Sequence, residues 1–216
     1  MWSNFMGPFI MHPITARALN IAENKLRFIV PPDIGGSFGI KTSIYPYLTL
    51  LGLLSMQVDV PVKWIEDRRE HLLASSVQTD RVSYREVAVT KNGMVLGFRT
   101  KLYDNVGAYL RTPEPATTFR PIGNVVGPYR VKNLQIDANV VVTNKCPTGP
   151  NRAYGCAHLY FEQERLMDEV AEKLKLDPAE VQLRNFIQPD EFPYTTPTGG
   201  IYDSGDYPKA FQLALK

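Results

Sequence analysis

The feature that most constrains the fold is a pair of strand-like runs joined by a short turn. The runs cover residues 82–90 and 95–102. Between them lies Lys91-Asn92-Gly93-Met94, and an Asn-Gly pair supplies the positive φ angles that a tight hairpin turn needs. We therefore predict a hairpin here.

The rest of the chain mixes helical and strand patterns without a strict alternation of the two. Helices are predicted near residues 14–21, over 45–57, from about 159 to 174, over 178–186 and from about 207 onward. Strands are predicted over residues 26–30, 60–65 and 134–143. The Leu-rich helix 45–57 is expected to be buried. This mixture indicates an α/β protein of the α+β type, with mixed, largely antiparallel sheets and packed helices.

Composition narrows the class of protein. There are 24 Lys and Arg residues against 22 Asp and Glu, so the charge of +2 gives no case for nucleic-acid binding. The longest apolar stretch falls short of the ~20 residues that a membrane span needs. Two cysteines (Cys146 and Cys156) and three histidines (His12, His71 and His158) lack metal-ligand spacing. With no secretory signal visible, we expect a cytoplasmic protein.

Residues 35–42 read Gly-Gly-Ser-Phe-Gly-Ile-Lys-Thr, between a predicted strand and a predicted helix. Such a glycine loop can bring backbone N–H groups close to an anion. Lys41 and Thr42 fit the end of a phosphate loop, but Ile40 stands where that motif needs its second glycine. A tight turn without a ligand is the other interpretation. Phe38, a large aromatic in a glycine loop, has to pack somewhere and can brace a cofactor.

A second loop rich in small residues, 149–155, reads Gly-Pro-Asn-Arg-Ala-Tyr-Gly before a predicted helix. Its arginine, Arg152, can donate paired hydrogen bonds to phosphate or oxo groups. A solvated arginine in a surface turn is the commoner case for a lone residue of this kind. The two interpretations stay open on the residues alone.

Taken in order, the motifs resemble the molybdopterin-binding large subunit of the molybdenum hydroxylases. This family includes xanthine dehydrogenase, aldehyde oxidoreductase and aerobic carbon monoxide dehydrogenase, and the resemblance is nearest to the last. It is carried by residues 35–41, 44–46, 61–68, 143–145, 164–165, 185–187 and 202–207. The resemblance implies that residues 1–216 form the first molybdenum-cofactor domain, without the N-terminal hammerhead-like domain or the second cofactor domain.

The resemblance also implies roles for individual residues. Substrate-site roles fall on Tyr154, which would line the substrate pocket, and on Arg120, which would orient the substrate. An ordinary structural role for Arg120 is equally compatible with the sequence. Cofactor contacts are implied for Gly35, Gly36, Phe38, Gly39 and Arg152.

The activity implied is hydroxylation of an aldehyde or a heterocycle with oxygen from water. The implied cofactor is molybdopterin cytosine dinucleotide, with electrons passing to Fe–S clusters and FAD on partner chains. Because the family's general base lies in the second cofactor domain, this chain alone is expected to be inactive. The chain starts in structured sequence and stops within a predicted helix, so we expect a split subunit or a truncated piece.

Three departures from the family pattern restrict this expectation. Ala153 stands where carbon monoxide dehydrogenase has a copper-bridging cysteine, and Thr42 where the purine-oxidising branch has a glutamate. Gly7 occupies the place of a glutamine that many members use near the metal. These changes argue against carbon monoxide and purine substrates. A degenerate, non-catalytic scaffold domain therefore stays open as an alternative function. A nucleotide-binding protein that uses residues 35–42 as a phosphate loop is the other alternative.

Overall fold

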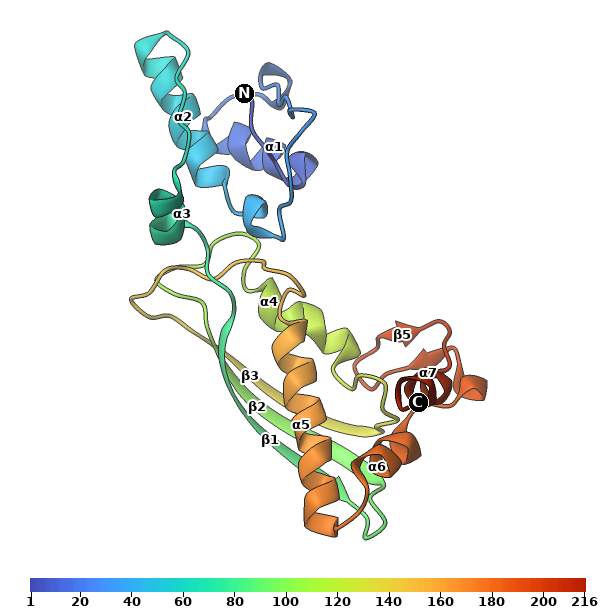
Figure 1. The fold of residues 1–216 in the computed structure, drawn as a ribbon. Coiled ribbons are helices and arrows are strands. Elements are labelled where there is room, and N and C mark those ends of the chain that lie inside the picture. Colours follow the sequence, from blue (N-terminus) through green and yellow to red (C-terminus); the bar gives the residue numbers. More distant parts are fainter. The chain divides into compact units, whose positions relative to one another are not determined.

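The computed structural model describes the whole chain, residues 1–216, and Figure 1 shows its elements. The chain divides into two compact units, each assembled from segments that are separate in sequence. The first unit contains residues 1–80, 105–115 and 142–154, and the second contains residues 81–104, 116–141 and 155–216. No helix combines the length and the apolar character needed to cross a membrane.

The first unit is mainly helical. Its elements are α1 (Pro8–Ala18), the 3-10 helices η1 (Glu23–Lys25) and η2 (Ile40–Thr42), α2 (Tyr45–Val58) and α3 (Arg68–Ala74). Helices α1 and α2 contact each other. Phe5, Met11 and Leu48 form a small buried core there, and the ring of Phe28 stacks on that of Phe5 at 4.2 Å between centroids.

The two predicted helices of this unit are confirmed, although α1 ends at Ala18, before Ile21. The expected burial of α2 is wrong. Leu48 is its only buried residue, whereas Leu50 and Met56 are 54% and 56% exposed. Apolar residues surround the axis of α2, and packing on one neighbouring helix covers only one stripe of such a surface.

Two strands predicted in this unit are also wrong. Residues 26–30 make only an isolated parallel bridge between Ile29 and Trp2. The following Pro31 and Pro32 have no N–H to continue a ladder. Residues 60–65 form no strand, and Pro61 likewise removes a ladder donor. Apolar composition alone does not make a strand where no partner strand is available.

The second unit is built on a three-stranded sheet in the order β1-β2-β3. The strands are β1 (Asp80–Val89), β2 (Val95–Asn105) and β3 (Asn133–Val141), with the first residue of β1 and the last of β2 belonging to the first unit. The 19-residue helix α5 (Cys156–Leu174) crosses one face of the sheet (Figure 1). Phe98 from β2 and Met167 and Val170 from α5 belong to one buried cluster, which forms the main core.

Shorter elements complete the second unit. They are α4 (Ala116–Phe119), η3 (Arg120–Asn124), α6 (Pro178–Asn185), η4 (Pro189–Glu191), the antiparallel pair β4 (Tyr194–Thr195) and β5 (Ile201–Tyr202), and α7 (Tyr207–Ala214). The predicted N-cap of α6 is confirmed, because the Asp177 carboxylate accepts from the Glu180 N–H at 3.0 Å. The mixture of helices with small sheets confirms the predicted α+β class.

The predicted hairpin is confirmed, but its turn differs from the expectation. Thr90 N–H donates to the Met94 carbonyl at 2.9 Å across the turn. Only Gly93 has a positive φ, of 81°, so Asn92 does not share the left-handed backbone that a two-residue turn would require.

A buried asparagine holds this turn against α6. Asn185, 1% exposed, accepts a hydrogen bond from Val95 N–H at its Oδ1 and donates from Nδ2 to the carbonyls of Gly93 and Val181, each at 2.8 Å. Buried polar groups need such partners, because an unmet one keeps its full desolvation cost. Asn185 therefore connects the hairpin to the helical layer.

Replacing this side chain tests that connection. Asn185→Ala removes three hydrogen bonds to buried backbone groups and should lower the free energy of unfolding by about 3 kcal/mol. Asn133→Ala is the matched control. Its exposed side chain makes one hydrogen bond, to the Leu96 carbonyl, so about 1 kcal/mol or less is expected. Urea unfolding measures both, and equal losses would contradict the role given to Asn185.

Candidate functional site

The first glycine loop, residues 35–39, lies in the first unit and leads into η2. Gly35, Phe38 and Gly39 have φ of 62°, 53° and 108°. The Ser37 hydroxyl accepts from the N–H groups of Gly39 and Lys41, both at 3.3 Å. A side chain within the loop therefore holds its second half, while Gly35 and Gly36 remain exposed.

The ring of Phe38 folds back over Gly36. A Cβ at Gly36 would lie 2.6 Å from the Phe38 ring, so any larger residue there would push the ring aside. The ring is nevertheless 66% exposed. An aromatic side chain held in a left-handed backbone and left largely uncovered is a feature that packing does not explain, and such strain is typical of functional loops.

The second loop touches the first at one point. A Cβ at Gly39 would lie 2.5 Å from the carbonyl oxygen of Pro150, closer than any real side chain approaches. Gly39 is therefore required twice, by its φ of 108° and by the approach of the second loop's backbone. The close approach places the two loops side by side, with Pro150 packed against Gly39.

The second loop is strained as well. Ala153, Tyr154 and Gly155 have successive φ values of 71°, 44° and 85°. Asn151 organises the loop: its Oδ1 accepts from Arg152 N–H and its carbonyl from Tyr154 N–H, both at 2.7 Å. Left-handed backbone at non-glycine residues costs about 1–2 kcal/mol each, so the surrounding contacts must hold it in place.

Arg152 is presented to solvent by this loop. Its side chain is exposed and makes no hydrogen bond or ion pair with the rest of the chain. The guanidinium is therefore available to an anionic ligand next to the contact between the loops. Tyr154 is half-buried in the same unit.

The residues predicted for the site are distributed over both units. Arg120 lies in the second unit, exposed at the first position of η3. The first unit holds Gly35, Gly36, Phe38, Gly39, Arg152 and Tyr154. Within it, the structure brings Gly39 against the loop that carries Arg152; the role of each residue stays a prediction.

The phosphate-loop alternative is weakened by Lys41. Its Nζ donates back to the Ile34 carbonyl, so the ammonium is engaged by the loop's own backbone. The residue after Gly39 is the β-branched Ile40, which starts η2. Neither residue forms the open cradle that a triphosphate needs.

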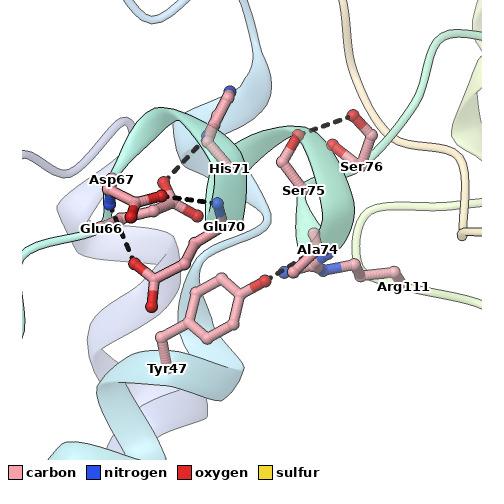
Figure 2. A network of polar contacts seen from close by, with 9 residues as sticks. All are labelled: Tyr47, Glu66, Asp67, Glu70, His71, Ala74, Ser75, Ser76 and Arg111. Atoms are coloured by element: carbon pink, nitrogen blue, oxygen red, sulfur yellow. Dashed lines mark hydrogen bonds and ion pairs between the residues drawn. The ribbon is translucent and has the colours of Figure 1, made fainter.

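A network of polar contacts that the sequence did not predict holds the segment that follows the first loop (Figure 2). Arg111 donates from Nε to the Ser43 carbonyl at 2.9 Å and from Nη1 to the Ala74 carbonyl at 3.1 Å. Tyr47 donates to the same Ala74 carbonyl at 2.8 Å, and its ring lies 5.3 Å from the guanidinium. Arg111 thus ties the end of η2 to the end of α3.

Helix α3 is itself fixed at its start. Asp67 and Glu70 form a reciprocal capping box, with hydrogen bonds of 2.7 and 2.9 Å (Figure 2). His71 lies 2.8 Å from the Glu66 carboxylate. The Asp-x-x-Glu spacing was a readable signal for this helix, whereas nothing around Arg111 in the sequence marks it as a buried bridge.

Comparison with known proteins identifies the chain. Residues 1–186 match the molybdopterin cofactor-binding domain family. The carbon monoxide dehydrogenase large chain of Afipia carboxidovorans is 33% identical over 100% of this chain and 27% of its own length. The nicotine 6-hydroxylase large subunit of Paenarthrobacter nicotinovorans is 33% identical over 96% of this chain and 25% of its own length.

Solved structures agree with these relatives. Quinoline 2-oxidoreductase from Pseudomonas putida 86 superposes with a TM-score of 0.90 at 31% identity, over 98% of this chain and 27% of that one. Carbon monoxide dehydrogenase from Oligotropha carboxidovorans gives 0.91 at 32% identity, over 99% and 27%. This chain belongs to the molybdopterin cofactor-binding domain family. Within it, the chain corresponds to the first cofactor domain of a molybdenum hydroxylase large subunit, and spans about a quarter of its relatives' length.

The two loops fit the group that this family binds. Molybdopterin is anionic, and the loops offer exposed backbone at Gly35 and Gly36 and the unengaged cation of Arg152. A Cβ at Gly35 would meet nothing within 4 Å, so the space beside the loop is open. Phe38 adds an exposed aromatic face.

Gly39 and Gly35 provide a matched pair for testing the contact between the loops. Both have positive φ, but only Gly39 meets another backbone. Gly39→Ala should lower the free energy of unfolding by about 3 kcal/mol, because the new methyl collides with Pro150. Gly35→Ala should cost only about 1 kcal/mol, from φ strain alone. Urea unfolding of both variants measures the difference, and equal losses would mean that the close approach of Gly39 to Pro150 adds nothing to the free energy of unfolding.

Proposed function

We propose that this chain supplies one side of the molybdopterin site in the catalytic subunit of a molybdenum hydroxylase. The observation that carries the proposal is the contact of Gly39 with Pro150, which holds the exposed Phe38 loop beside the loop of the unengaged Arg152. The reaction proposed is hydroxylation of an aldehyde or a heterocycle with oxygen from water. Relatives named for nicotine and quinoline support the heterocycle.

The chain's own residues would hold and orient the cofactor. Backbone at Gly35 and Gly36 can approach it closely, because no side chain intervenes there. Phe38 would cover one face, and Arg152 would donate hydrogen bonds to its anionic oxygens. The bound molybdopterin, proposed in its cytosine dinucleotide form, supplies the two-electron redox chemistry, for which the protein provides binding, orientation and electrostatics.

Roles toward the substrate fall on two further residues. Tyr154, held in a strained backbone two residues after Arg152, is proposed to line the substrate pocket. Arg120 is proposed to orient the substrate, and that assignment rests on the family resemblance alone. The absence of a cysteine at Ala153 argues against carbon monoxide as substrate, although relatives carry that name.

Other polypeptides are proposed to complete the enzyme. The relatives are four times as long and are named as large chains or subunits. We propose that a second cofactor domain, an Fe–S subunit and an FAD subunit join this chain, and that residues 1–216 alone are inactive. Substrate turnover by the purified 216-residue chain without these partners would contradict the proposal.

The cofactor content of the assembled complex tests the function. Elemental analysis should give about one molybdenum per chain, and acid hydrolysis should release a cytosine nucleotide. Bound ATP without molybdenum would favour the phosphate-loop alternative. A complex with neither group would favour a non-catalytic scaffold domain.

Arg152→Ala should lower molybdenum retention in the complex. Removing a charge-assisted hydrogen bond of about 1.5–3 kcal/mol corresponds to a tenfold or greater loss of affinity. Arg17→Ala, at another exposed arginine of the first unit, is the control and should retain molybdenum fully. Molybdenum content after dialysis measures the effect. Unchanged content in Arg152→Ala would remove the role given to this residue.

A further inference from the structure

A pocket of about 360 Å³ lies in the first unit, among residues after the first glycine loop, α2, α3 and Arg111. Figure 2 shows several of the residues that line it, among them Tyr47, His71 and Arg111. Its volume falls at the lower end of the range for small-molecule sites. The polar side chains that line it include Lys41, Ser43, Tyr47, His71, Ser76 and Arg111.

Arg111 is the buried charged side chain of this pocket. It is only 3% exposed, and no carboxylate lies within ion-pair distance of it. Two backbone carbonyls and the face of Tyr47 partly compensate the cation, while Nη2 has no hydrogen-bond partner in the chain. A buried cation without a counter-ion is costly, so an anion beside it would relieve that cost.

The carboxylates that line the pocket are already engaged. Glu66 lies 2.8 Å from His71, and Asp67 accepts from Glu70 N–H in the capping box of α3. Arg68 also lines the pocket. Neither carboxylate pairs with Arg111, and the cations Lys41, Arg68 and Arg111 outnumber these two carboxylates in the lining.

Ser76 gives a second, independent indication of a ligand. It is 7% exposed, and its hydroxyl is buried without a hydrogen-bond partner. Ser76 lines the pocket, and a serine hydroxyl can turn its proton toward an acceptor there. The pocket therefore contains two unused donors, Ser76 Oγ and Arg111 Nη2.

We propose that this pocket binds a small oxyanion, a phosphate or a carboxylate, between Arg111 and Ser76. The residues of this site are not those assigned to the molybdopterin, although Ile40 and Lys41 follow Gly39 directly and Ser76 packs against Gly149 at the start of the second loop. Because Arg111 also ties Ser43 to Ala74, an anion here would stabilise the segment that follows the first loop. Nothing in this inference depends on the proposed hydroxylase function.

Thermal unfolding of the 216-residue chain, without cofactor, tests the site. Inorganic phosphate or acetate should raise Tm with the logarithm of the anion concentration above Kd, by about 3 °C at tenfold excess over Kd, while chloride at equal ionic strength should not. Ser76→Ala should weaken the binding of the anion that raises Tm at least about twofold, and Arg111→Met at least about tenfold. Arg69→Gln, at an exposed arginine of α3 outside the pocket, should leave the response unchanged.

Ser76→Ala keeps the test decisive if Arg111→Met does not fold. A chain that responds to none of these anions would overturn the proposal, as would a response that Ser76→Ala leaves intact. A shift equal for phosphate, acetate and chloride would do the same, since it would report ionic strength only.

Discussion

The approach of Gly39 to the Pro150 carbonyl is the constraint on which the rest of the first unit depends. No side chain larger than hydrogen fits at this position, and no L-residue favours its φ of 108°. The contact joins two loops that are more than 100 residues apart in sequence. Exposed groups on both loops are thereby held near one another before any ligand binds, which is the preorganisation that a cofactor site requires.

Other residues of the first unit stabilise the segments next to this contact. Arg111 anchors Ser43, just after η2, to the end of α3, and the capping box of Asp67 and Glu70 fixes the start of that helix. Gly149 fits against Ser76 and Ser43, since a Cβ there would lie 2.6 Å from Ser76 Oγ. The segment before Pro150 is therefore held by the same network that holds the first loop.

The second unit gains its stability in a different way. Its core is formed by α5 against the sheet, and its buried ion pair joins Arg81 to Asp104 at 2.7 Å. Thr118 also donates to Asp104, at 2.5 Å, so α4 is attached to both strands. Apolar packing around a buried ion pair explains this unit, whereas strained backbone and a buried arginine without an ion pair mark the first.

Local patterns in the sequence predicted the second unit well. The hairpin, β3, α5, α6 and α7 all follow from periodicity, caps and turn residues, because their main contacts are with neighbours whose patterns are equally clear. Strands predicted over 26–30 and 60–65 failed because a strand requires a partner, which composition does not reveal. The exposed apolar face of α2 could not be predicted either, since burial depends on which element covers a helix.

Much the same division applies to the candidate site. The glycine loop could be recognised as a possible anion-binding loop and Arg152 as a possible partner for phosphate or oxo groups. The order of the motifs indicated the family. The contact between Gly39 and Pro150, the organising role of Asn151 and the buried Arg111 depend on segments distant in sequence, and no local pattern encodes them. The positive φ at Phe38 and Ala153 contradicts the local preference of those residues, which is where functional constraint commonly overrides propensity.

The position of molybdenum in the assembled complex would show whether the two loops of the first unit hold the cofactor. Anomalous scattering from crystals of that complex would locate the metal without reference to the protein's chemistry. We expect a peak adjacent to the backbone of Phe38 and Gly39, with the Arg152 guanidinium hydrogen-bonded to the cofactor. A molybdenum peak that contacts neither loop of the first unit would contradict it.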